Sequence, residues 1–266
     1  MNKLSISPKK VALILTIIVL SLTAAHILGQ YYKNFVGNDA FLLKIVDKVD
    51  LDGESNNLPN WYQSSALLFS SFLLAIIAVV KKAEEDANVR HWAFLALTFV
   101  YLSLDELVSI HEQATVPLRH AFDLHGVFYL SWVIPAAILL AVFLVLYLKF
   151  LWRLPSDTRW LLIAAGAIYV FGAVGVEMID AKFLELHEVR IMDSAATGSV
   201  IFQYALMTAV EEFFEMAGIV TFIYALLSYI VPEAVSTQLS PITKPGRIRE
   251  TNLVLSEPAV VRASAE

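Results

Sequence analysis

The stretch Ser103-Leu104-Asp105-Glu106-Leu107-Val108-Ser109-Ile110-His111-Glu112 places three acids and a histidine inside an apolar run long enough to cross a lipid bilayer. An ionisable side chain at the centre of a bilayer costs roughly 2.5 kcal/mol or more, so it is usually retained for a partner or a function. Two later apolar runs have the same character: one holds Glu177-Met178-Ile179-Asp180, and the other holds Glu211-Glu212-Phe213-Phe214-Glu215. The three clusters together call for one explanation.

The composition is that of an integral membrane protein. Of the 266 residues, 58% are hydrophobic and 17% are charged, against about 25% charged residues in soluble domains. The mean hydropathy is +0.66 and the net charge is -6. There is no cysteine, which excludes disulfides, thiolate metal sites, iron–sulfur clusters and cysteine nucleophiles. Any metal ion would therefore be bound by nitrogen and oxygen atoms.

The apolar windows predict an all-α fold, a polytopic membrane helix bundle with about six transmembrane helices. The first apolar run is longer than the core of a signal peptide, so we expect it to be retained as a span. A polar tail rich in Pro, Ser and Thr is expected to be disordered. We expect a transmembrane domain over residues 1–235 and a tail over 236–266, with spans at about 11–29, 61–80, 92–112, 127–150, 159–181 and 199–230.

Lysine and arginine residues predict the orientation of the chain. They are more frequent in the segments that face the cytoplasm when the N-terminus is inside, which is the distribution expected of a membrane protein. We therefore expect a multi-pass protein of the bacterial inner (plasma) membrane with both termini in the cytoplasm. The loop after the first span contains a short amphipathic segment, 41–46, which is predicted to lie on the outer membrane surface.

Helical periodicity gives each acidic span a single polar stripe. At about 100° per residue, Asp105 and Glu112 share one stripe with Glu106 at its margin, whereas His111 points elsewhere unless the helix ends there. One polar stripe on an apolar cylinder is typical of a face turned towards the interior of a bundle. The rise along each helix also places the clusters at a similar depth, between the midplane and the outer surface. The other two stripes contain Glu177, Asp180, His187 and Glu188, and Thr208, Glu211, Glu215 and the marginal Glu212.

So many carboxylates in a low dielectric cannot all be ionised without countercharge, so either several are protonated or metal cations lie among them. Carboxylate and imidazole ligands without thiolate favour a divalent metal, with Fe preferred over Zn or Mn. The pattern resembles that of the di-iron carboxylate proteins, although the Glu-x-x-His signature of that class is absent. We expect general acid or base roles for Glu106 and Glu212, and metal ligands among Asp105, His111, Glu112, Glu177, Asp180, His187, Glu211 and Glu215.

Three phrases of the sequence look like those of a recurring bacterial multi-pass membrane family of uncharacterised activity. They are Asn57-Leu58-Pro59-Asn60-Trp61 at the opening of a span, the stretch 103–112, and the run from Glu211 to Gly218. This resemblance covers most of the chain and implies no activity. The Glu211-Glu212 pair also resembles the start of the CAAX-type protease motif, but Met216 stands where that motif continues with arginine.

The sequence favours a membrane protein with a buried metal site in the outer half of the bilayer, for which a di-iron centre is one candidate. We expect it to be an oxidoreductase that acts on a lipid or quinone-like substrate. A proton or divalent-cation transporter or channel would use the same acids, and a metal-dependent membrane hydrolase or a structural subunit also remains open. The acidic spans become almost wholly apolar on the cytoplasmic side, which favours a one-sided pocket. Membrane lipids are the expected partners, nucleic acid is not, and the oligomeric state is left open.

Overall fold

The computed structural model describes residues 7–37, 39–51, 57–187 and 198–239, with the backbone alone for 231–239. These ranges contain helices and no strand, which confirms the all-α prediction. In chain order the helices are α1 (Pro8–Tyr31), the π-helical η1 (Tyr32–Val36), α2 (Ala40–Lys48), α3 (Leu58–Ala83), α4 (Val89–Val108), the 3-10 turn η2 (Glu112–Ala114), α5 (Thr115–Phe122), the 3-10 turn η3 (Gly126–Phe128), α6 (Val133–Arg153), α7 (Ser156–Val170), the π-helical η4 (Phe171–Val176), α8 (Glu177–Leu186) and α9 (Gly198–Leu239).

Six helical segments are long and apolar enough to cross a membrane, as the sequence predicted. Their bounds differ from the predicted ones in two places that affect the acids. The third segment ends at Val108, before His111, whereas the fifth continues through η4 and α8 to Leu186. Helix α9 reaches Leu239, so its end passes the predicted start of the tail, and residues 240–266 lie outside the described part of the chain.

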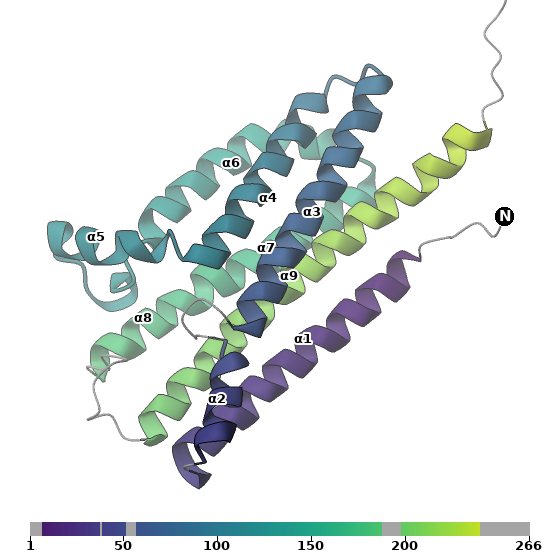
Figure 1. The fold of residues 1–266 in the computed structure, drawn as a ribbon. Coiled ribbons are helices and arrows are strands. Elements are labelled where there is room, and N and C mark those ends of the chain that lie inside the picture. The colour runs from purple at the N-terminus through teal and green to yellow at the C-terminus, as the bar shows by residue number, and fades with distance from the viewer. Residues whose placement is uncertain (1–6, 38, 52–56, 188–197, 240–266) are drawn as a thin grey trace, which may run out of the picture.

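Helix α9 is the central element of the bundle. It packs against α1, α3 and α7, and α4 packs on α3 and also meets α9, where Phe99 stacks on Phe222. Figure 1 shows the long helices running roughly side by side, with α1 beginning at the same end of the bundle where α9 ends. We call this the Pro8 end. Helices α2, α5 and the end of α8 lie at the opposite end, which we call the α5 end (Figure 1).

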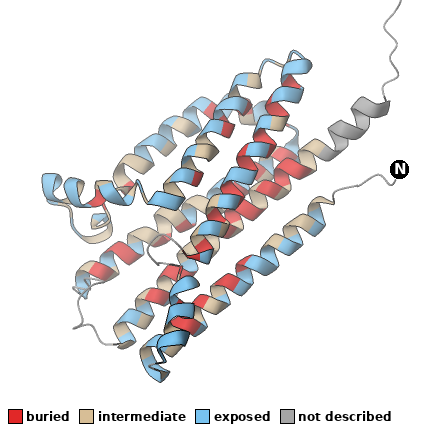
Figure 2. Cartoon of the chain, viewed as in Figure 1, coloured by how far each residue is buried: buried red, intermediate tan, exposed pale blue. Residues whose placement is uncertain are grey.

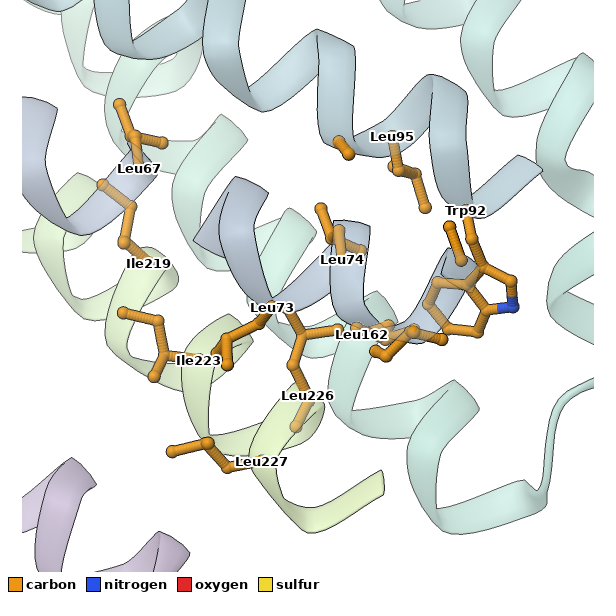
Figure 3. Close-up of a cluster of buried hydrophobic side chains, with 14 of the residues drawn as sticks. Leu67, Leu73, Leu74, Trp92, Leu95, Leu162, Ile219, Ile223, Leu226 and Leu227 are labelled. Atoms are coloured by element: carbon orange, nitrogen blue, oxygen red, sulfur yellow. The ribbon is translucent and has the colours of Figure 1, made fainter. Parts of the chain in front are cut away.

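The apolar core fills the Pro8 end of the bundle. Leu74, Ile223 and Leu226 are fully buried at 0% exposure, and Trp92 packs among them at 1%. Figure 3 shows these side chains, from α3, α4 and α9, meeting Leu162 of α7. Figure 2 shows the same burial as red bands along the middle of α3 and α9. Dense packing of this kind fixes the relative positions of the helices.

Two glycines allow α9 to contact α7 and η4 directly. A Cβ atom on Gly172 would lie 2.7 Å from the Glu211 carbonyl oxygen, and one on Gly218 would lie 2.7 Å from the Tyr169 nitrogen. Small residues permit this close approach of helix backbones in membrane proteins. The contact sets the acidic turn of α9 beside the start of α8, where Glu177 lies.

The amphipathic segment predicted at 41–46 lies in α2. Asp39 caps this helix by accepting hydrogen bonds from the backbone N–H groups of Phe41 and Leu42. Val46 is buried and packs closely against Gly29 of α1, whereas Phe41 is 72% exposed. The helix is therefore attached to α1 by one face and leaves an apolar face uncovered.

Candidate functional site

The turn that follows α4 brings His111 back to Asp105, in the last turn of that helix. Ser109 adopts a left-handed backbone conformation with φ of 47°, which stops the helix after Val108. The His111 backbone N–H then donates to Asp105 Oδ1 at 2.9 Å, and His111 Nδ1 lies 2.8 Å from Asp105 Oδ2. Helical periodicity alone would separate these two side chains, so it is the turn at Ser109 that joins them.

Trp132, just before α6, connects this histidine to the fifth span. Its Nε1–H donates to Glu177 Oε1 at 2.8 Å, and its ring lies 4.4 Å from the His111 ring, centroid to centroid. One indole therefore links the end of α4 with the start of α8. The acids of the third and fifth spans are neighbours because of this contact.

A second group of acids is bound by an amide and a phenol. Gln63 of α3 is 1% exposed, and its Nε2 donates to Glu215 Oε2 of α9 at 3.0 Å. The Glu106 carboxyl of α4 also lies within hydrogen-bonding reach of Gln63, and the Tyr169 side chain of α7 lies within reach of Glu215. We call Glu106, Glu215, Gln63 and Tyr169 the amide-bound group. Its acids have neutral donors beside them.

A third group consists of carboxyls alone. Asp180 of α8 is 1% exposed, and neither of its carboxyl oxygens meets a hydrogen-bond donor among the described residues. It faces the Glu211 carboxyl at hydrogen-bonding range, and Glu211 in turn faces Glu177. Two ionised carboxylates cannot hydrogen-bond to each other, so these contacts require a proton or a cation between them. We call Asp180, Glu211 and Glu177 the three-carboxyl group.

Glu215 connects the two groups. Its charge acts on Glu106 and on Glu177, and Glu211 is also within its electrostatic reach. Acids from the third, fifth and sixth spans therefore gather in one interior region at the α5 end, next to the apolar core.

Some of the predicted metal ligands lie outside this cluster of acids. His187 is exposed: its Nδ1 lies 3.0 Å from the Phe183 carbonyl and its ring packs on the Phe183 ring. Glu112 is exposed in η2, although its charge acts on His111. Glu212 is half-buried beside Glu211, and Glu188 lies outside the described residues. Within the described ranges, no set of three or more histidine and acidic side chains is arranged to hold one metal ion as it stands.

Three residues of the site were missed by the sequence analysis. Gln63 stands in a serine-rich apolar span, where an amide is itself a signal because its buried donors need partners. Trp132 is indistinguishable in sequence from an interfacial aromatic anchor. Tyr169 lies in an apolar run with no ionisable neighbour, so only its contact with α9 reveals its role.

An ion pair between His125, which lies outside the spans, and Glu185 near the end of the fifth span holds the segment after α5 to α8. Glu185 accepts hydrogen bonds from His125 Nδ1 at 2.9 Å and from the Gly126 backbone N–H at 2.7 Å. Hydrogen bonding to Glu185, and then to Asp123, raises the pKa of the exposed His125 imidazole above its ordinary value. This contact places η3 over the end of α8.

Comparison with known proteins gives a family without a known activity. No curated protein and no solved structure matches the chain. A family model described as Domain of unknown function (DUF8692) matches residues 12–230, which is most of the chain and includes every acid of the site. The protein therefore belongs to this uncharacterised family.

Proposed function

We propose that this protein is a metal-dependent oxidoreductase of the bacterial inner membrane, with both termini in the cytoplasm and its acidic centre in the outer half of the bilayer. The centre would bind a divalent metal, with iron favoured over zinc or manganese because its donors are carboxylates and imidazole. The substrate would be a lipid or a quinone-like molecule. The six apolar helices and the gathering of acids at one end of the bundle support this proposal.

The observation that carries the proposal is the surroundings of Asp180. This carboxyl is buried, lacks a donor and faces a second carboxyl, Glu211, which faces a third, Glu177. Buried carboxyls at hydrogen-bonding range need a proton or a cation among them, and no described lysine or arginine ion pair reaches them. A bound metal cation would supply that charge, with the carboxylates of Asp180, Glu211 and Glu177 as its ligands.

The remaining residues suit proton transfer around such a centre. Iron held by Asp180, Glu211 and Glu177 would supply redox chemistry by accepting electrons from a quinol-like substrate, and neighbouring carboxylates would accept the protons that the substrate releases. Glu106, oriented by Gln63, and Glu212, beside Glu211, are the candidate proton acceptors. Asp105 and His111 are partly exposed, with side-chain exposures of 14% and 29%.

Elemental analysis of protein purified without added metal tests the proposal. Iron that copurifies with the wild-type protein, and is lost in Asp180→Asn, is the expected result. The matched control is Asp157→Asn, an exposed aspartate at the Pro8 end, which should keep the wild-type metal content. Metal-free wild-type protein, or an Asp180→Asn variant with full metal content, would overturn the assignment.

Proton transfer without metal is the second candidate function. It is favoured by one observation: the contacts between carboxyls in the three-carboxyl group can be satisfied by shared protons, and no ready three-ligand arrangement exists in the described part of the chain. Liposomes containing metal-free protein would then conduct protons under an applied membrane potential. Proton flux that is abolished in Glu211→Gln and present without metal would favour this function over the oxidoreductase.

A further inference from the structure

Helix α6 is buried only near its two ends. Three of its residues are buried: Val133 at the α5 end, and Tyr147 and Phe150 at the Pro8 end. Helical spacing places Ala136, Leu140 and Phe143 on the same face as these three, yet each of them is only half-buried. Figure 2 shows α6 in the exposed and intermediate colours over most of its length. The middle of its inward face is thus incompletely covered.

The facing side of α4 is uncovered at the same level. At the Pro8 end, His91 stacks on Phe150 with ring centroids 5.1 Å apart, and the Tyr147 hydroxyl donates to the His91 carbonyl at 2.9 Å. These contacts identify the face of α4 that looks towards α6. Phe94 also looks towards α6, because its ring centroid lies 6.4 Å from that of Tyr147. Tyr101 follows Phe94 by two helical turns on the same side, and yet it is 52% exposed. The aromatic contacts therefore hold α4 and α6 together at the Pro8 end. Beyond that end, the facing side chains of the two helices are only partly covered.

The uncovered level leads to the acids. Asp105 follows Tyr101 by one helical turn, and its charge acts on the Tyr101 side chain. Beyond Asp105, the Trp132 ring packs at a tilt against His111 and its Nε1–H donates to Glu177. Aromatic contacts thus join α4 to α6 at the Pro8 end and His111 to Trp132 at the α5 end. The side chains between these contacts, next to Asp105, are only partly covered.

We propose that a neutral amphiphile with an oxygen-bearing head reaches the acidic centre sideways from the membrane, between α4 and α6. This inference rests on the proposed function and names its substrate class and route. The head would contact the Tyr101 hydroxyl and Asp105, and the apolar tail would lie along Ala136 and Leu140. The excess of carboxylates repels anionic phosphate headgroups, so the charge of the site selects a neutral head such as that of a quinone.

Photolabelling of the wild-type protein tests the route directly. The probe is an azido-benzoquinone with a ten-carbon tail, added to the full-length protein in phosphatidylcholine nanodiscs and mapped by peptide mass spectrometry. Adducts are expected within 98–105 of α4 and 136–140 of α6, and an excess of unlabelled decylquinone should suppress them. Adducts confined to other helices, or labelling that the competitor does not change, would overturn the proposal.

A matched pair of variants on α6 tests the opening itself. Ala136→Phe adds a ring on the inward face and should abolish the competed labelling. Ala141→Phe adds the same ring on an exposed face of the same helix and should label like the wild type. Equal labelling of the two variants would contradict the route. If Ala136→Phe does not fold, the positions of the adducts in the wild-type protein still test the route.

Metal content separates the two proposals. Wild-type protein that contains iron but is not labelled at the expected peptides refutes the route and leaves the metal centre standing. Metal-free protein that is labelled there, with labelling lost in Ala136→Phe, refutes the metal centre and supports the route. Both Ala136→Phe and Ala141→Phe should retain wild-type metal, because neither position belongs to the acidic groups.

Discussion

The two halves of α9 place one continuous helix in two opposite environments. From Ile219 to Leu227 its side chains are buried among apolar side chains of α3, α4 and α7, and Ile223 and Leu226 have no exposure. From Glu211 to Glu215 the same helix presents carboxyls to Gln63 and to Asp180. Close packing of apolar side chains stabilises the apolar half. The acidic half is stable only if each buried polar atom has a hydrogen-bond partner or a cation.

This difference shows how a membrane protein can retain buried acids, whose removal from water is unfavourable. Within lipid, helices associate through packing and hydrogen bonds, because the lipid tails are as apolar as leucine. The packed half, together with the glycine contacts of Gly172 and Gly218, sets the helix positions. The packed half therefore positions the acidic half of the same helix.

Removal of packing in the apolar half should have the largest effect. Leu226→Ala leaves a cavity in the core and should lower the free energy of unfolding by about 2–4 kcal/mol, since the missing methyl groups have no substitute neighbours. Reversible unfolding in mixed micelles measures this loss. Val145→Ala, at a position that is 75% exposed on α6, is the control and should change little. Equal losses in the two variants would mean that burial does not distinguish the two positions.

Removal of the amide in the acidic half should have a smaller effect on stability. Gln63→Leu leaves Glu215 and Glu106 without that donor, and an unmade hydrogen bond of this kind costs about 1–2 kcal/mol. The same unfolding assay applies, with Gln203→Leu, an exposed glutamine of α9, as the control. A Gln63→Leu protein as stable as the control variant would show that the amide-bound group does not contribute to the fold.

The smallest effect is expected at the exposed contact of His125. Because the pKa of His125 is raised in the folded protein, its contact with Glu185 contributes fully to stability below the unfolded-state pKa. That contribution is lost as the pH rises through the folded-state pKa. An NMR titration of the imidazole should give a higher midpoint in the wild type than in Glu185→Gln. Asp123→Asn should lower the midpoint less, because Glu185 is the stronger influence. Identical midpoints in the wild type and Glu185→Gln would contradict this contact.

The sequence predicted the long elements well and the turns poorly. Apolar windows located six spans, because a bilayer demands about 20 apolar residues for each crossing. The end of α4 was misplaced, because a left-handed residue such as Ser109 leaves no pattern in composition or period. The π-helical η4 likewise falls in an ordinary apolar run and changes the register just before Glu177.

The partners of the acids could not be read from the sequence. Periodicity put Asp105 and Asp180 on inward faces, but it separated His111 from Asp105 and gave no role to Trp132. The turn that joins the first pair, and the indole that reaches Glu177, depend on the positions of different helices. Such contacts are set at distances of about 3 Å, far finer than the spacing of a helical stripe.

The sequence by itself determined that acids from three spans face the interior of an apolar bundle, because lipid excludes unpaired charge and the helical period fixes which residues share a face. Only the tertiary structure decided which carboxyl meets an amide and which meets another carboxyl. That choice follows from the close approach of α9 to α7 and η4 at Gly172 and Gly218, and from the single turn at Ser109. Both are local backbone events, which side-chain periodicity does not record.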